Sequence, residues 1–301
     1  DDRVINIISQ TFGGLLIDDG RVNVNLPDDD SWTLADDSTI NITGLAGDQT
    51  SHSIAGSQFD IGGIINIDGR TRFSAPIDLL GVGTDTNGVV QLADAASSLE
   101  LSADSAFSGG SVLGPGQLRS NNATVAGHGM IDADVNFSGA SVLRAEDGVL
   151  LISGNIDDLG AELGVVGSDA TLQVEDSTWD IAQADEVVIN GGTLTDGDAL
   201  TFVQNRGGVL RGHGLVSLNS LNNNGLIVAE SRTLEINDRL DWDGSSTAST
   251  DEGDGVLSAD GGDLLISHAM FQGPSFVGTI DIASRSRFIY DTVGSADEIL
   301  F

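Results

Sequence analysis

One sequence unit occurs twice in this chain of 301 residues, and its two copies lie about 84 residues apart. Residues 127–131, GHGMI, return as residues 212–216, GHGLV. Upstream of each copy, residues 107–113, FSGGSVL, resemble residues 189–194, INGGTL. We expect a third copy to start at residues 271–276, FQGPSF. Repeats of this kind indicate a fold that buries its core by stacking similar units.

A second repeat links distant parts of the chain, because residues 65–73, INIDGRTRF, match residues 280–288, IDIASRSRF. Both contain a shorter theme, in which a small residue precedes a β-prone run with an apolar side chain at every second position. Such alternation predicts strands with one buried face. The segments with this pattern are residues 38–43, 63–68, 97–102, 170–175, 177–182, 232–237 and 278–283.

The composition favours an all-β chain. Glycine accounts for 40 of 301 residues, and Gly, Asn, Asp and Ser separate the β-prone runs in the way that tight turns require. Helical periodicity is scarce, and residues 180–188 are the best short helical candidate.

These patterns predict a parallel β-helix, or β-solenoid, with irregular coils and a right-handed course. Coils of roughly 20–25 residues would stack about 4.8 Å apart and bury an aliphatic column. A β-sandwich is the competing architecture. We expect a single domain over residues 1–301. Its first part, residues 1–106, is less regular. Residues 107–188 and 189–270 are two repeat units, and residues 271–301 begin a further unit.

Charge excludes several classes of partner. Twelve basic residues against 46 acidic ones give a net charge of −34, too few cations for binding to nucleic acid or to anionic lipid. No apolar run approaches the ~20 residues of a membrane-spanning helix. Cysteine is absent, which excludes disulfides and thiolate chemistry and suits export. The chain begins at Asp1 without Met, so we expect a mature product or an excised piece.

The order of motifs over residues 191–244 resembles the repeat of bacterial secreted β-helix proteins, which include autotransporter passenger domains and adhesin-like surface proteins. The shared elements are GHGLV, NNNGLI and TLEI, and the likeness covers residues 107–270 best. It departs from the family at Ala229-Glu230, where many members have Pro-Gly. The resemblance implies export and a surface or matrix role. It implies no ligand.

Two kinds of residue are candidates for a metal site. Acidic runs could bind calcium weakly, although no calcium-repeat motif is present; the candidate ligands are Asp28, Asp29, Asp30, Asp251, Glu252 and Asp254. His128 and His213 occupy equivalent positions in the repeat, so a shared role in a turn is favoured over catalysis or metal binding. Apart from calcium we expect no cofactor and no catalytic residue.

A carbohydrate-active enzyme, a lyase or a hydrolase, is the alternative function, because such enzymes also use β-helices. Arg70 with Arg72, or Arg285 with Arg287, could provide the basic group of a lyase, since residues two apart in a strand share a face. Pairing with aspartates of adjacent coils is the structural alternative for these arginines. A glycan-binding module without turnover is a third possibility.

The leading hypothesis is an extracellular, non-enzymatic structural or adhesive solenoid that assembles with copies of itself, with surface glycans as further partners. The strand pattern continues close to both ends of the sequence, and open coil ends are unpaired edges. We therefore expect axial contacts, or contacts by strand addition. The residues assigned to this role are Val4, Ile5, Ile7, Ile299, Leu300 and Phe301.

Overall fold

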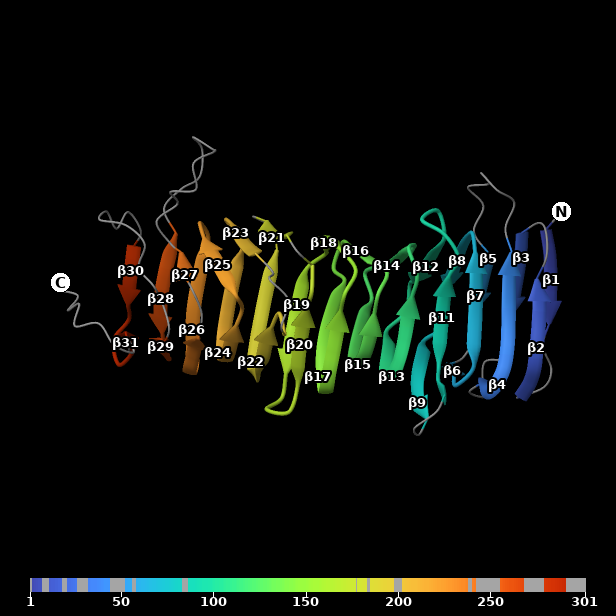
Figure 1. The fold of residues 1–301 in the computed structure, drawn as a ribbon, viewed down its shortest axis with the longest axis horizontal. Coiled ribbons are helices and arrows are strands. Elements are labelled where there is room, and N and C mark those ends of the chain that lie inside the picture. Colours follow the sequence, from blue (N-terminus) through green and yellow to red (C-terminus); the bar gives the residue numbers. More distant parts are fainter. Residues whose placement is uncertain are drawn as a thin grey trace. The chain divides into compact units, whose positions relative to one another are not determined.

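The computed structural model describes residues 2–6, 11–17, 21–25, 32–43, 52–55, 58–82, 86–176, 178–182, 185–197, 202–237, 240–241, 255–267 and 279–290. These residues form strands and turns, without a helix in any of the described ranges. The chain divides into two compact units, Asp1–Ala161 (unit 1) and Glu162–Phe301 (unit 2), and Figure 1 shows the strands of each.

Each coil of unit 1 has up to three strand-bearing sides, which we call the A, B and C faces. The A face is a parallel sheet of separate strands, whose members pair in chain order. It consists of β1 (Asp2–Asn6), β3 (Arg21–Asn25), β5 (His52–Ala55), β8 (Arg70–Phe73), β12 (Ser98–Leu101), β14 (Gln117–Asn121), β16 (Asp134–Ser138) and β18 (Ile156–Leu159).

The B and C faces of unit 1 share long strands that turn a corner, and the register between neighbouring coils shifts there. The long strands are β2 (Thr11–Ile17), β4 (Trp32–Thr43), β13 (Ser105–Leu113), β15 (Thr124–Ile131) and β17 (Val142–Ile152). In other coils the corner separates two short strands, one on each face: β6 (Phe59–Ile61) and β9 (Ile77–Val82) on the B face, β7 (Ile64–Asp68) and β11 (Val89–Leu92) on the C face.

Unit 2 repeats this plan. Its A face contains β21 (Thr178–Ala182), β23 (Phe202–Arg206), β25 (Ser220–Asn223) and β27 (Leu240–Asp241). Long strands β22 (Glu186–Thr195), β24 (Val209–Ser217) and β26 (Leu226–Ile236) turn from the B face to the C face. Short strands β19 (Glu162–Val166), β28 (Val256–Asp260) and β30 (Thr279–Ile282) extend the B face, while β20 (Thr171–Val174), β29 (Asp263–Ile266) and β31 (Arg287–Tyr290) extend the C face.

Within each unit the strand pairs are parallel, except for the antiparallel hairpin of β9 with the short β10 (Thr86–Asn87). Parallel strands stacked coil upon coil confirm the predicted β-solenoid, and the β-sandwich alternative is wrong. Handedness and the single-domain assignment stay predictions.

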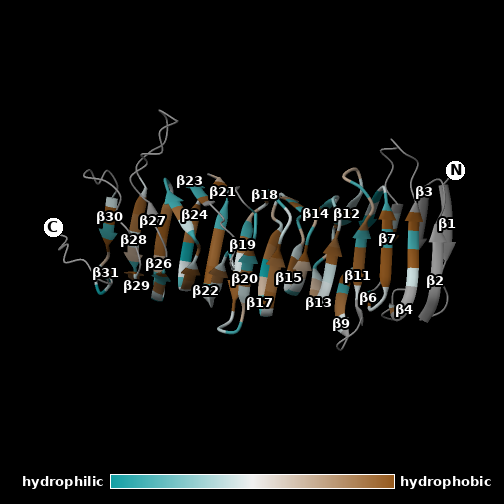
Figure 2. Ribbon diagram, in the orientation of Figure 1, coloured by the Kyte–Doolittle hydropathy of each residue, from teal (hydrophilic) through white to brown (hydrophobic). Residues whose placement is uncertain are grey.

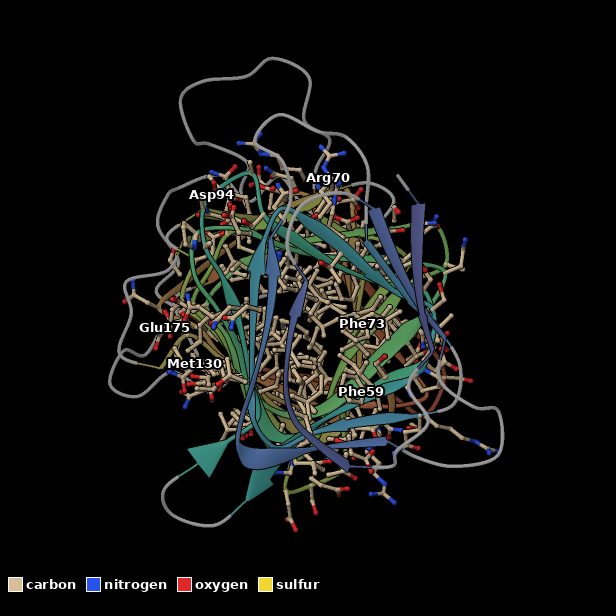
Figure 3. All side chains as sticks on the ribbon, turned by 90° about the vertical axis from the view of Figure 1, so that its right-hand side faces the viewer. Phe59, Arg70, Phe73, Asp94, Met130 and Glu175 are labelled. Atoms are coloured by element: carbon tan, nitrogen blue, oxygen red, sulfur yellow. The ribbon has the colours of Figure 1, made fainter. Side chains whose placement is uncertain are left out.

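The core follows from the alternation in the sequence. Ile65 and Ile67 of β7 are fully buried, whereas Ile64 is 40% exposed. Phe59 and Phe73 stack inside unit 1, with ring centroids 6.1 Å apart, and Figure 3 shows both pointing inward. In unit 2 the fully buried Trp179 is the largest side chain of the core. Figure 2 shows hydrophobic segments recurring along the strands of both units.

Glycine at the corner explains the GHG repeat. Gly127 has a φ of +128° and Gly212 a φ of +121°, in the left-handed region that favours glycine. A Cβ at Gly127 would overlap the carbonyl oxygen of Phe107 in the preceding coil, and one at Gly212 would overlap that of Ile189. The repeat therefore marks a corner at which consecutive coils approach too closely for a side chain.

The seven segments with alternating apolar residues all contain strands, which confirms that part of the prediction. The helical candidate at residues 180–188 is wrong, because its ends belong to β21 and β22. The expected third repeat start, residues 271–276, lies outside the described residues.

Candidate interaction faces

The predicted calcium ligands fall outside the described part of the chain, and calcium binding stays a prediction. These residues are Asp28, Asp29, Asp30, Asp251, Glu252 and Asp254. Within the described ranges, no group of three or more His, Cys, Asp or Glu side chains could hold a metal ion.

The predicted self-assembly residues are described only in part. Val4 and Ile5 belong to β1, which comes first in the strand order of the A face and pairs with β3. Ile7, Ile299, Leu300 and Phe301 lie outside the described residues.

The two arginine pairs differ in structure. Arg70 and Arg72 both lie on β8, as expected, and Figure 3 shows Arg70 on the outside of the coil. Arg285, in contrast, occupies a turn with a φ of +73° before β31 begins at Arg287. The prediction that Arg285 and Arg287 share a strand is therefore wrong. The Ser286 amide donates to the Ala283 carbonyl oxygen at 3.2 Å, and this hydrogen bond closes the turn between β30 and β31.

Arginines join successive coils. On the A face of unit 1, Arg72 Nη2 lies 2.7 Å from Glu100 Oε1, one coil away. On the C face of unit 2, Arg287 Nε donates to Asp263 Oδ1 at 3.1 Å. That hydrogen bond and the guanidinium charge hold the pKa of Asp263 below its usual value. One arginine of each pair thus binds an acid of the adjacent coil. Arg287 binds an aspartate, as the structural alternative expected, whereas the partner of Arg72 is a glutamate.

A three-membered ion network spans three coils on the B face of unit 2. Arg211 of β24 donates to Glu186 of the preceding coil, and its Nη1 lies 3.1 Å from Glu230 Oε2 of the following coil. The hydrogen bond to Glu186 is the main reason that the pKa of Arg211 is raised above its usual value. The three side chains are each about one-third exposed. The network ties coils together along a solvated face.

Amide side chains also join coils. On the C face of unit 1, Asn66 Nδ2 donates to Asn41 Oδ1 at 2.7 Å, across the ladder between β4 and β7. In unit 2, the fully buried Asn205 donates to Asn223 Oδ1 at 2.8 Å. Such in-register amide pairs add side-chain hydrogen bonds between neighbouring coils, alongside the backbone hydrogen bonds of the sheet.

His128 and His213 lie at the corners of the two units. An added Cβ at Gly109 would stand 3.7 Å from His128 Nε2, and one at Gly191 would stand 3.8 Å from His213 Nε2. Both imidazoles thus lie near a glycine of the preceding coil. The two histidines therefore occupy equivalent positions in the structure, and their role in the turn stays a prediction.

The partners of these side chains were not predicted from the sequence. Arg211 and Glu230 lie outside the seven segments in which alternation was noted, and the coil register that brings them together depends on loop lengths. The outward residues of each face could nevertheless have been compared for charge from the sequence alone.

In the parts of the chain that the structure describes, no helix is long and apolar enough to span a membrane. Comparison of the chain with protein-family models, curated proteins and solved structures found no match.

Proposed function

We propose that this chain is a non-enzymatic structural or adhesive β-solenoid that works outside the cell, as a filament or surface-matrix subunit. The observation that carries the proposal is the in-register stacking of coils in both units. Each coil adds a parallel backbone ladder, a layer of buried aliphatic side chains and bonds between outward side chains. A structure built in this way resists bending and shear, because any deformation breaks several ladders at once.

Charge and composition support the extracellular part of the proposal. A net charge of −34 keeps the chain soluble, and its self-repulsion is relieved by salt or divalent cations. The absence of cysteine makes the fold independent of thiol oxidation. The resemblance of residues 191–244 to secreted β-helix repeats agrees with both points.

Electron microscopy of the purified chain, with millimolar calcium or with a chelator, tests the proposal. We expect filaments or matrices with a regular repeat, more abundant with calcium because the cation screens the acidic surface. Single particles under every condition would count against assembly, and depolymerisation of an acidic polysaccharide by the same sample would favour the enzyme alternative. Protease treatment of intact source cells tests the location, since a surface protein is cleaved without lysis.

A further inference from the structure

The C face of unit 1 carries two outward columns of side chains that are almost free of charge. Backbone pairing places their members in register from coil to coil. The first column consists of Thr39, Ile64, Val89, Ser111, Met130 and Leu151. The second consists of Asn41, Asn66, Gln91 and Leu113, and it continues with Asp132 and Ser153, which directly follow the paired Ile131 and Ile152.

Several apolar members of this face meet solvent. Ile64 is 40% exposed, and Val149, at the corner that leads into the last coil of the face, is 49% exposed. Val89, Met130 and Leu151 are half-buried, and Figure 3 shows Met130 on the outside. Asp132 is the only charged residue of the two columns, and it accepts a hydrogen bond of 2.8 Å from Ser153 Oγ. The exposed Asp68, at the end of β7, lies beyond the second column at the edge of the face.

The other two faces of unit 1 are charged at the corresponding outward positions. On the A face, Arg72, Glu100 and Arg119 follow one another in register. On the B face, Asp60 and Asp78 are in register. In a chain with 46 acidic residues, the C face of unit 1 is therefore chemically distinct from its neighbours.

We propose that this C face is the lateral contact with a second copy of the chain, an inference that rests on the assembly role proposed above. Two copies with a charge of −34 repel each other, so they can approach closely only where the facing side chains are uncharged. A second copy also has the same coil spacing of about 4.8 Å, so its side-chain columns interdigitate with these without mismatch. A twofold axis would make the face its own complement.

The size of the face sets the strength of the contact. Six strands spaced about 4.8 Å apart span ~24 Å, and three residues of strand are ~10 Å wide, so each copy buries roughly 250 Å². Stable complexes bury about 800 Å² per partner. One such contact is therefore weak and reversible, and it gains strength when many copies are held together in an assembly.

Salt distinguishes this contact from one made of ion pairs. Raising the ionic strength from about 0.01 M to about 1 M shortens the Debye length from ~30 to ~3 Å. Repulsion between copies then weakens while the uncharged contact persists, so association strengthens with salt. An interface of ion pairs would weaken.

The test is sedimentation velocity of the full chain over a range of concentrations and at both salt limits. The double variant Ile64→Glu/Val89→Glu places two carboxylates in register on the C face and should weaken dimerisation at least about tenfold. The matched control Thr124→Glu/Val142→Glu adds two carboxylates to an in-register pair on the B face. It should change the dimerisation constant less than about twofold. Circular dichroism verifies that each variant is folded.

A control pair that weakens dimerisation as much as the C-face pair would overturn the proposal, as would a wild-type chain that stays monomeric at high salt. If Ile64→Glu/Val89→Glu does not fold, Ile64→Thr/Val89→Thr keeps strand propensity and should still weaken association severalfold. An unchanged dimerisation constant for the threonine variant would overturn the proposal too. Filaments seen by microscopy in these cases would leave the structural role standing and place its contacts elsewhere.

Discussion

The C faces of the two units have the same strand geometry but different outward chemistry. In unit 1 the column through Ile64, Val89 and Met130 is uncharged. In unit 2 the equivalent column consists of Thr171, Thr193, Leu215, Glu235, Leu265 and Ile289. Glu235 lies in the middle of that column and accepts a hydrogen bond of 2.8 Å from Ser267 Oγ.

A second difference lies beside this column, where Asp263 and Arg287 form an exposed ion pair on unit 2. The comparison shows that a solenoid separates two kinds of constraint. Inward side chains must pack in the core and corners must allow close approach of consecutive coils, and both units have aliphatic residues at the first and glycines at the second. Outward positions are free to differ, and there the two units differ in charge.

The largest expected effect concerns what the units share. Gly127→Ala and Gly212→Ala should each destabilise the fold by at least about 3 kcal/mol, because the added Cβ strains a positive φ and overlaps a backbone carbonyl of the preceding coil. Guanidinium unfolding measures both. Gly167→Ala is the matched control: its φ is +101°, but no atom lies within 4 Å of the new Cβ, so it should cost about 1–2 kcal/mol. Equal losses at all three glycines would contradict the close approach of coils at the corner.

Smaller losses are expected from the outward ion pairs. Arg211→Met leaves Glu186 and Glu230 without their shared cation and should destabilise the fold by about 1 kcal/mol, whereas Arg72→Met removes one exposed pair and should cost ~0.5 kcal/mol or less. Thermal unfolding at low and high salt compares the destabilisation caused by the two variants. The difference between the two destabilisations should shrink as salt rises, and a difference that grows would contradict its electrostatic origin.

Removing one charge should make the C face of unit 2 more like that of unit 1. Glu235→Gln keeps an oxygen that can accept from Ser267 and should strengthen self-association about two- to threefold in sedimentation experiments at low salt. Asp281→Asn, which removes the same charge from the exposed B face of unit 2, is the control. If the two variants behave alike, total charge decides association and the C face has no special part in it.

The smallest effect is a dependence on pH. Ser97 Oγ and the Ala96 amide donate to Asp94, both at 2.9 Å, and these bonds hold the pKa of Asp94 below 3.8; Arg287 does the same for Asp263. A carboxyl with a lowered pKa stabilises the fold fully above 3.8, and this contribution is lost as the pH falls through the lower folded value. Asp94→Asn and Asp263→Asn should therefore lower Tm at neutral pH, and the difference in Tm between variant and wild type should disappear well below pH 3.8. A difference in Tm that does not change with pH would contradict the lowered pKa of these carboxyls.

Much of the fold could be predicted from residues alone. Alternation predicted the strands that contain Ile65, Leu172 and Leu234, and all three side chains are fully buried. The GHG copies predicted equivalent positions for His128 and His213, which lie at equivalent corners. The sequence placed Arg285 on a strand, because a turn that contains serines and the end of a strand have similar residue patterns over a few positions. The candidate interaction face was missed because no single strand contains it.

The sequence by itself determined the strands, their buried sides and the glycine corners, since these depend on neighbours in the chain and on local backbone sterics. Only the tertiary structure decided which coil sides the strands occupy. The matching segments that begin at Ile65 and Ile280 show this plainly. The first gives β7 on the C face and β8 on the A face, whereas the second gives β30 on the B face and β31 on the C face. Local pattern sets alternation, but register with the neighbouring coil depends on the intervening turns and on burial of the whole stack, and that register assembles the outward columns.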